Sequence, residues 1–243
     1  MKKVITCFSI LALSAILFGC SEKKSTSSVN TNTNIEIVHQ QHQGQELDHN
    51  HGNDHEHSHQ LDEEQKKIYN GYFEDEQVHD RPLSNWEGDW QSVYPYLEDG
   101  TLDEVFEHKA AHNEEQTFDE VKAYYNSGYK TSTDRIVINN NFVTFFDHGH
   151  EHIGEYEYDG YEILTYAKGN KGVRYIFKHV GDEKGVPAYI QFSDHIISAQ
   201  NSDHFHLYWG NDRKSLLEEI TNWPTYYTSN MDGHAIAHEM IVH

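Results

Sequence analysis

Five short runs between residues 135 and 177 alternate apolar and polar side chains, and this pattern constrains the fold of the 243-residue chain more than any other feature. A period of two is typical of a β-strand with one buried face. Asn, Asp and Gly lie between the runs, as in the turns of β-hairpins. We therefore predict an antiparallel meander with hairpin connections at 139–141, 159–160 and 168–172, and with strands at 135–138, 142–146, 155–158, 161–166 and 173–177.

Further elements complete this meander on both sides. A strand entry around 85–94 and strands near 187–193 and 203–209 bring the count to about eight, enough to close a small barrel. Thr101 and Thr117 each stand three residues before Glu, the capping-box spacing of a helix start. Helices are expected at 102–111, 118–127, 212–221 and 232–242. The predicted fold class is mainly β with flanking helices (α+β), built on an antiparallel barrel.

The first 19 residues have the pattern of an export signal. Two lysines precede an apolar run of about 15 residues, shorter than the ~20 that a spanning helix needs. The run ends in Leu17-Phe18-Gly19-Cys20, which resembles the bacterial lipobox. We expect cleavage before Cys20, acylation of Cys20 with fatty acids such as palmitate, and attachment to the outside of the bacterial cell membrane, or to the outer membrane if the cell is Gram-negative. The alternative is an uncleaved membrane anchor.

Residues 20–60 are predicted to form a disordered, histidine-rich tether. They contain no apolar period and too little apolar surface to offset the entropy of ordering. Imidazoles interleaved with carboxylates offer weak, exchangeable sites for Zn(II), Ni(II) or Cu(II), against the alternative of a solvated spacer. The seven histidines of this possible auxiliary site are His39, His42, His49, His51, His55, His57 and His59.

Residues 61–243 have the size of one domain with its own core. Asp and Glu total 40 against 18 Lys and Arg, a formal charge of −22. Phosphate binding requires a basic surface, so we exclude nucleic acid as a partner. Both cysteines, Cys7 and Cys20, belong to the export and lipidation segment, so a metal site in this domain has to use imidazole and carboxylate ligands.

Three histidines of this domain stand at a spacing that suits a metal site. His204 and His206 are two residues apart on a predicted strand and therefore point to one face, while Phe205 packs away from them. His195 ends the preceding strand, and the eight-residue connection can turn it back beside that pair. Three neutral imidazoles bind zinc at about 2.0–2.1 Å and leave a fourth position for water or a carboxylate.

The fourth ligand and the metal stay open. Asp194 and Asp203 each adjoin a histidine, but neighbouring strand residues point to opposite faces, so neither is assigned as a ligand. Cd(II), Ni(II) and Cu(II) accept the same imidazole ligands as Zn(II).

The sequence around these histidines resembles the ZinT (YodA-like) family of extracytoplasmic zinc-binding proteins. The resemblance implies a calycin-like, lipocalin-related barrel with added helices and zinc ligands at His195, His204 and His206. It also implies zinc scavenging and delivery to the solute-binding protein of a zinc ABC importer. In some Gram-positive bacteria a similar domain is fused to that binding protein. The segments that carry the resemblance are 86–95 (WEGDWQSVYP), 156–161 (YEYDGY), 171–175 (KGVRY), 191–195 (QFSDH), 203–211 (DHFHLYWGN) and 222–227 (NWPTYY).

Other histidines allow a second metal site or none. His148, His150 and His152 occupy an expected hairpin turn, and they form either an exposed auxiliary site or a solvated turn. His234 and His238 are four apart on the last predicted helix, where an amphipathic surface is the simpler interpretation. A zinc-protease signature is excluded, because the interval from His238 to the final histidine is five residues rather than four.

The hypothesis that combines these features is a lipid-tethered zinc scavenger that is not an enzyme. One alternative is a zinc hydrolase or hydratase, since zinc on three histidines lowers the pKa of bound water to about 7. Another is a calycin-type carrier of a small apolar ligand with a structural metal, which a wide aromatic-lined cavity in the structure would favour.

Overall fold

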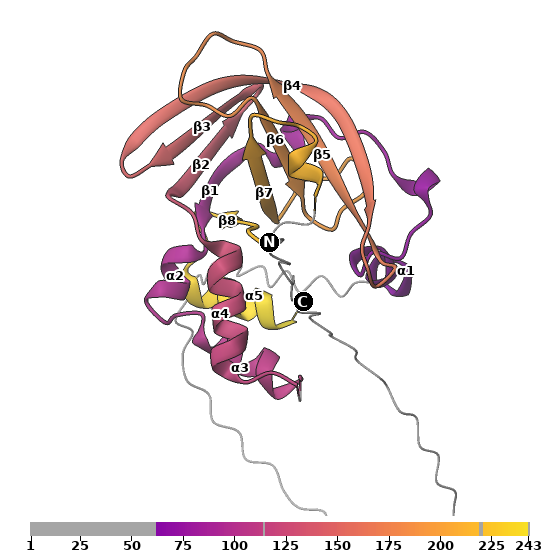
Figure 1. The fold of residues 1–243 in the computed structure, drawn as a ribbon, viewed down its shortest axis with the longest axis vertical. Coiled ribbons are helices and arrows are strands. Elements are labelled where there is room, and N and C mark those ends of the chain that lie inside the picture. Colours follow the sequence, from indigo (N-terminus) through magenta and orange to yellow (C-terminus); the bar gives the residue numbers. More distant parts are fainter. Residues whose placement is uncertain (1–61, 114, 219–220, 243) are drawn as a thin grey trace, which may run out of the picture. The chain divides into compact units, whose positions relative to one another are not determined.

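The computed structural model describes residues 62–113, 115–218 and 221–242. In these ranges eight antiparallel strands form one closed barrel in which each strand pairs with the next along the chain and β8 pairs with β1 (Figure 1). Closure pairs both edges of the sheet. The predicted fold class, a mainly β antiparallel barrel with flanking helices, is confirmed. The strands are β1 (Gly88–Ser92), β2 (Thr133–Asn139), β3 (Phe142–Asp147), β4 (His150–Thr165), β5 (Lys171–His179), β6 (Tyr189–Ser193), β7 (His204–Gly210) and β8 (Thr225–Thr228).

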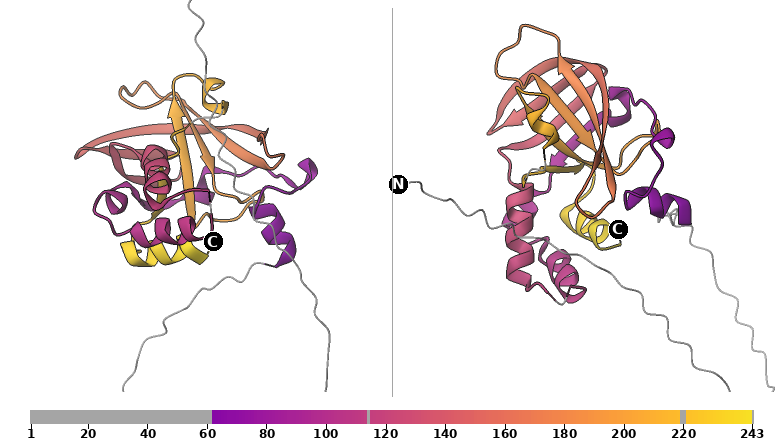
Figure 2. Two further views of the ribbon diagram at one scale, coloured as in Figure 1. Left: turned by 60° about the horizontal axis from the view of Figure 1, so that its bottom comes forward. Right: turned by 45° about the vertical axis from the view of Figure 1, so that its right-hand side comes forward.

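Five α-helices flank the barrel. The views in Figure 2 show α3, α4 and α5 grouped together and α1 apart from them. None of the helices in the described ranges combines the length and the apolarity needed to cross a bilayer. They are α1 (Glu63–Tyr69), α2 (Tyr94–Glu98), α3 (Asp103–Ala111), α4 (Phe118–Tyr129) and α5 (Gly233–Val242), with single 3-10 turns at η1 (Asp75–Gln77), η2 (Leu83–Trp86) and η3 (Ser215–Leu217).

One of the two predicted capping boxes is confirmed. The Thr117 hydroxyl accepts a hydrogen bond from the Glu120 backbone N–H, and the Glu120 carboxylate accepts one from the Thr117 N–H. The other prediction is wrong, because α3 is capped by Leu102 and begins one residue later than expected. Glu104 is therefore the second helical residue and not the third, so it does not complete a box with Thr101.

The predicted strands 155–158 and 161–166 are one continuous strand. β4 runs for 16 residues, and both of its halves pair with β5. The predicted hairpin turn at 159–160 is wrong: the register shifts there, and Gly160 has φ +88, which is the signature of a β-bulge. The bulge bends β4 around the barrel without ending it.

The predicted helix at 212–221 is also wrong. The chain forms only the 3-10 turn η3, which Lys214 precedes, and it is extended again at Glu218. The Asp212 side chain accepts a hydrogen bond from the Ser215 N–H at the start of this turn. The β-branched and aromatic residues that follow form β8, which closes the barrel between β7 and β1. The predicted count of eight strands thus results from two errors that cancel, one strand divided and one missed.

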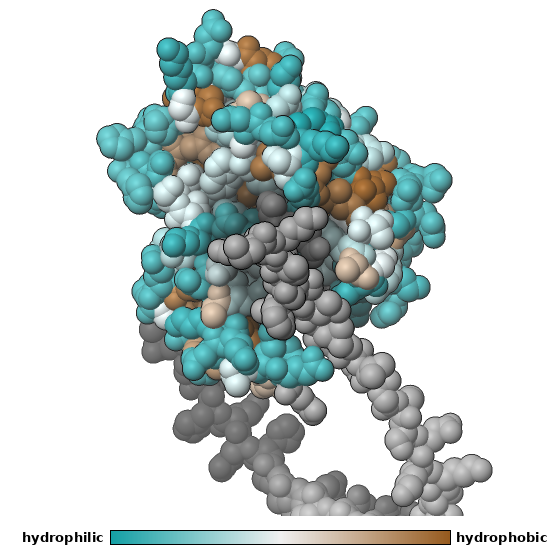
Figure 3. All heavy atoms as spheres, in the orientation of Figure 1, coloured by the Kyte–Doolittle hydropathy of each residue, from teal (hydrophilic) through white to brown (hydrophobic). Residues whose placement is uncertain are grey.

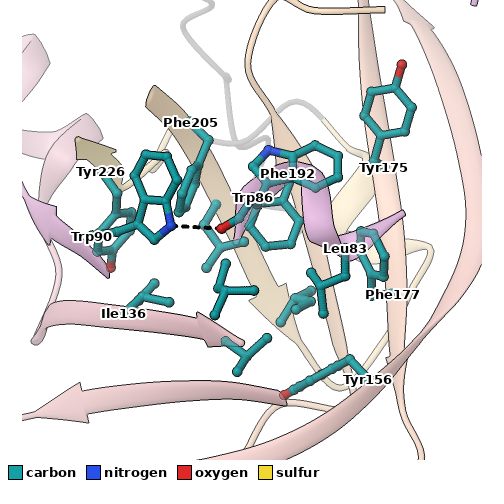
Figure 4. Packing of buried hydrophobic residues seen from close by; sticks show 14 of the residues in the cluster. Leu83, Trp86, Trp90, Ile136, Tyr156, Tyr175, Phe177, Phe192, Phe205 and Tyr226 are labelled. Carbon is teal, nitrogen blue, oxygen red and sulfur yellow. Dashed lines mark hydrogen bonds between the residues drawn. The ribbon is translucent and has the colours of Figure 1, made fainter. Parts of the chain in front are cut away.

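The barrel interior is filled by large side chains. Trp86 is fully buried at its centre, and the Trp90 Nε1–H donates to the Trp86 carbonyl oxygen over 2.8 Å (Figure 4). Phe192, Phe205 and Tyr226 pack around these two rings. Side chains of the described residues therefore fill the part of the barrel around Trp86, and the wide aromatic-lined cavity that would favour the apolar-carrier alternative is not seen there.

A second hydrophobic cluster lies outside the barrel wall, between the helices and β8. It includes Phe106 of α3, Val121 of α4, Ile236 of α5 and Tyr227 of β8. Successive residues of β8 thus serve both clusters, with Tyr226 inside the barrel and Tyr227 against the helices. On the face seen in Figure 3, hydrophilic residues surround several separate apolar areas.

Candidate metal centre

The three predicted histidines come together on the outer wall of the barrel. Phe205 is fully buried in the barrel interior, so His204 and His206 point outward from β7, as the alternation predicts. His195 lies two residues after Ser193, the last residue of β6, which pairs with His206. The adjacent strands β6 and β7 thus bring together residues that are 9 and 11 positions apart in the sequence.

The spacing of the imidazole rings suits one metal ion. Ring centroids are 6.1 Å apart for His195 and His204, 5.8 Å for His195 and His206, and 6.2 Å for His204 and His206. Zn–N bonds of about 2.0–2.1 Å in tetrahedral geometry place ring centroids roughly 5–5.5 Å apart. The rings are slightly more open than in a closed site, and no ready-made cluster of three ligands is found among the described His, Cys, Asp and Glu residues. A closure of less than about 1 Å between rings would complete the zinc geometry.

Hydrogen bonds at Nδ1 orient two of the three rings. His206 Nδ1 lies 2.7 Å from Thr225 Oγ1, whose own proton is donated to the Trp223 carbonyl oxygen. Thr225 therefore accepts from His206, and Nε2 of that ring carries the lone pair. His195 Nδ1 lies 3.1 Å from the Tyr69 carbonyl oxygen, which only accepts, and this fixes the same tautomer. Outer partners of this kind are typical of metal-binding histidines.

Two of the imidazole rings stack on tyrosine side chains. His195 stacks on Tyr69 at the end of α1, with centroids 4.4 Å apart, and His204 stacks on Tyr227 of β8 at 5.0 Å. Burial, with the neighbouring His195 and His204 as further causes, holds the pKa of His206 well below its usual value. A neutral imidazole is the form that binds a metal. The residues present therefore fit zinc as a cargo ion.

A buried ion pair anchors the loop that carries His195. Arg81 binds Asp194 through two hydrogen bonds of 2.6 and 2.9 Å, and both side chains are completely buried. The same guanidinium donates to the carbonyl oxygens of Ile196 and Gln200, so it ties both ends of the loop after β6. His195 itself has φ +63, a left-handed conformation that is uncommon outside glycine. Asp194 is thus a positioning residue for His195 and not a fourth ligand.

A cleft of about 260 Å³ opens beside the histidines. Its lining includes His195, His206, Tyr69, Lys171 and Arg174. The sequence patterns did not indicate a role for Arg81, Arg174, Tyr69 or Thr225. A charged residue in the apolar run 173–177 was the available signal for Arg174, and the direct proximity of Asp194 to His195 was the available signal for the anchored loop.

The hairpin histidines do not form a comparable group. His148 and Gly149 make the tight turn between β3 and β4, with φ +48 and +80, and both are exposed. His150 and His152 lie on β4, so His148 does not continue their strand face. In the described ranges no ring contact joins these three residues. Their role as an auxiliary metal site stays a prediction.

The remaining candidates divide between the surface and the part of the chain outside the described residues. His234 and His238 are exposed on α5, which fits the predicted amphipathic surface. The predicted tether with its seven histidines at 39–59, and the predicted acylation site Cys20, lie outside the described residues.

The closed barrel and the converging imidazoles define a class of protein, a lipocalin-like barrel with a candidate metal site on its wall. A sequence model of the ZinT (YodA) family, described as periplasmic, lipocalin-like and zinc-recruiting, matches residues 64–243. The chain belongs to this family.

Two relatives show how far the similarity extends. Probable metal-binding protein YrpE of Bacillus subtilis (strain 168) is 63% identical over 182 residues, which cover 75% of this chain and 72% of YrpE. Zinc-binding lipoprotein AdcA of Streptococcus pneumoniae (strain ATCC BAA-255 / R6) is 47% identical over 182 residues, which cover 74% of this chain and 36% of AdcA. This chain thus matches about a third of the streptococcal protein.

Solved structures also show which part of AdcA this chain resembles. The crystal structure of the Zn(II)-bound ZinT-like domain of S. pneumoniae AdcA has a TM-score of 0.69 and 47% identity, over 72% of this chain and 97% of that domain. Zn(II)-bound AdcA from the same organism has a TM-score of 0.71 over 72% of this chain and 38% of AdcA. The similarity therefore covers the ZinT-like domain of AdcA, and both structures contain zinc.

Proposed function

We propose that this chain captures Zn(II) outside the cytoplasm at His195, His204 and His206 and passes it to the solute-binding protein of a zinc ABC importer. The observation that carries the proposal is the convergence of three imidazoles, two of which are oriented by hydrogen bonds, His195 by Tyr69 and His206 by Thr225. The Zn(II)-bound state of a domain that is 47% identical supports zinc as the cargo.

The acidic, histidine-rich segment before α1 acts in this proposal as a first collector. Only two residues separate His59 from Asp62, which caps α1, and Tyr69 at the end of α1 contacts His195. Weak sites on the segment raise the local zinc concentration, and the three-histidine site retains the ion. Acylation of Cys20 would hold both at the membrane surface.

Zinc titration of the protein in competition with a chelator tests the binding step. We expect one tight zinc ion per chain in the wild type and its loss in His204→Ala plus His206→Ala, with weaker events that disappear when residues 39–59 lack histidine. Absence of the tight zinc ion in the wild type would refute the proposal. The same zinc-loaded protein should show no ester hydrolysis or CO₂ hydration above that of free zinc.

Two cellular experiments test the anchor and the delivery. The wild type should fractionate with the membrane and Cys20→Ala should not. A deletion strain should grow poorly under zinc chelation and recover with added zinc, and this defect should disappear in a strain that already lacks the importer. Equal fractionation of the two variants, or a defect that persists without the importer, would contradict these steps.

A further inference from the structure

The cleft that His195 and His206 line has the opposite charge to the rest of the protein. The chain carries a formal charge of −22, yet the residues that line the cleft include Lys171 and Arg174 and no Asp or Glu. Lys171 is neutralised, since its Nζ lies 2.7 Å from Asp75 and also donates to the Phe73 carbonyl oxygen. Arg174 is therefore the cation of this cleft whose charge needs an explanation.

Arg174 is buried without a carboxylate partner. The residue is only 4% exposed, and its guanidinium carbon lies 3.4 Å from the centroid of the Tyr208 ring. Among the described residues no Asp or Glu lies within ion-pair distance of it, and its Nε has no hydrogen-bond acceptor. A buried charge without an ion-pair partner is costly. By contrast, the buried Arg81 is bound by Asp194.

The strand register places Arg174 in line with the metal site. Tyr175 of β5 pairs with Phe192 of β6, which brings Arg174 beside Ser193, and Ser193 pairs with His206 of β7. Two strand spacings of about 4.8 Å each separate the backbones of Arg174 and His206. The side chains of both residues reach the cleft, and the positive charge of Arg174 is one cause of the lowered pKa of His206.

A zinc ion at the histidines would make this charge problem worse. The three imidazoles that bind it are neutral, so the ion and Arg174 together would place three positive charges at one cleft without a carboxylate in its lining. Zinc with three protein ligands also keeps a fourth position for an exogenous group. An anion that binds both zinc and Arg174 would neutralise part of the positive charge and would also supply the fourth zinc ligand.

We propose that the site binds zinc together with a small carboxylate, one oxygen of which takes the fourth zinc position while its charge is balanced by Arg174. A planar guanidinium matches a carboxylate in shape, and carboxylate oxygen is a normal zinc ligand. The cleft of about 260 Å³ is large enough for such an anion. The inference rests on the proposed zinc site and adds a second ligand to it.

The experiment measures zinc affinity by chelator competition in perchlorate and in acetate at equal ionic strength. Acetate in solution weakens apparent zinc binding slightly, since it competes for the ion. We expect the opposite here, an increase in affinity of about 10-fold, within the usual range of coupling between two ligands. Reciprocity requires zinc to strengthen acetate binding by the same factor, measured by NMR of ¹³C-labelled acetate.

Variants separate the carboxylate from the metal site. Arg174→Gln should bind one zinc ion with an affinity that acetate does not raise, and Arg174→Lys should retain part of the effect. Arg135→Gln, on the opposite wall, is the matched control and should behave as the wild type. Thermal melts verify folding. The visible spectrum of the Co(II)-substituted protein should shift with acetate in the wild type and in Arg135→Gln but not in Arg174→Gln.

The outcomes distinguish the two proposals. Loss of all tight zinc binding by the wild type refutes the zinc site itself, whereas tight zinc binding that is indifferent to acetate overturns only the carboxylate. A response to phosphate or chloride without a response to acetate also overturns it. An increase in the zinc affinity of the wild type with acetate shows that a free carboxylate enters the cleft.

Discussion

Two pairs of histidines in this protein have the same spacing and different surroundings. His204 and His206 on β7 meet His195 and lie against Tyr227 and Thr225. His150 and His152 on β4 are also two residues apart, but they lie at the mouth of an exposed hairpin, with His150 exposed and His152 partly buried. Spacing on a strand places side chains on one face, and the neighbouring elements decide whether that face becomes a site.

The largest expected effect concerns the ligands themselves. Changing His204 and His206 to Ala should weaken zinc binding by more than about 1,000-fold, equivalent to about 4 kcal/mol, since two of three nitrogen ligands are lost. The matched variant, His150→Ala plus His152→Ala, should change the affinity of the tight site by less than about 3-fold. Chelator competition measures both, and equal losses would remove the distinction between the two pairs.

The next effect concerns the anchor of the His195 loop. Asp194→Ala should lower the free energy of unfolding by about 3 kcal/mol or more, because it leaves Arg81 charged and buried without its partner. Urea denaturation monitored by Trp fluorescence measures the change. A neutral replacement of both residues, Arg81→Met plus Asp194→Leu, should recover part of the stability. A single substitution without effect would contradict the buried ion pair.

A smaller effect is expected at the outer partner of His206. Thr225→Val retains the shape of this 2% exposed side chain but removes the acceptor of the His206 Nδ1–H. Zinc affinity should fall by about 10- to 100-fold, as is typical for the loss of such a partner. Thr225→Ser keeps the hydroxyl and should retain wild-type affinity. Unchanged affinity in the Val variant would show that the ring needs no such orientation.

The smallest effect is expected near the hairpin, where Arg135 of β2 pairs with Asp89 of β1. Both side chains are nearly half exposed, and the hydrogen bond from Arg135 holds the pKa of Asp89 below its usual value. Because the folded-state pKa is the lower one, the stabilisation is present above about pH 4 and is lost as the pH falls further. Asp89→Asn should lower Tm by about 2 °C or less at pH 7. Thermal melts should show this difference shrinking toward pH 3, and a difference that grows in acid would contradict the assignment.

Sequence patterns predicted the features that depend on neighbouring residues. Alternation in β2, β3 and β7, the Thr117 capping box and the convergence of His204 with His206 follow from local geometry. Sequence patterns failed where pairing with distant strands determines the local structure. Asp159-Gly160 is a bulge because both halves of β4 find β5, and β8 exists because β1 and β7 leave a gap that it fills. That these three histidines bind zinc stays a prediction, with a geometry that supports it.

The residues that support the three histidines could not be predicted from the sequence, because their contacts join distant parts of the chain. Arg81 is 113 residues from Asp194, and Tyr69 is 126 residues from His195, so neither contact leaves a local pattern. Arg174 was visible as a charge within an apolar strand, but its relation to His206 depends on the register of β5, β6 and β7.

The position of the histidines on the outside of the barrel determines how an ion can leave. The interior is packed with aromatic rings and contributes a rigid wall, so loading and unloading need no opening of the strands. His195 is exposed on its loop, whereas His206 is held deeper against Thr225. In the proposed delivery, an incoming ligand from another protein meets His195 first and replaces the bonds to the ion one after another, so that release is an exchange of ligands at a surface.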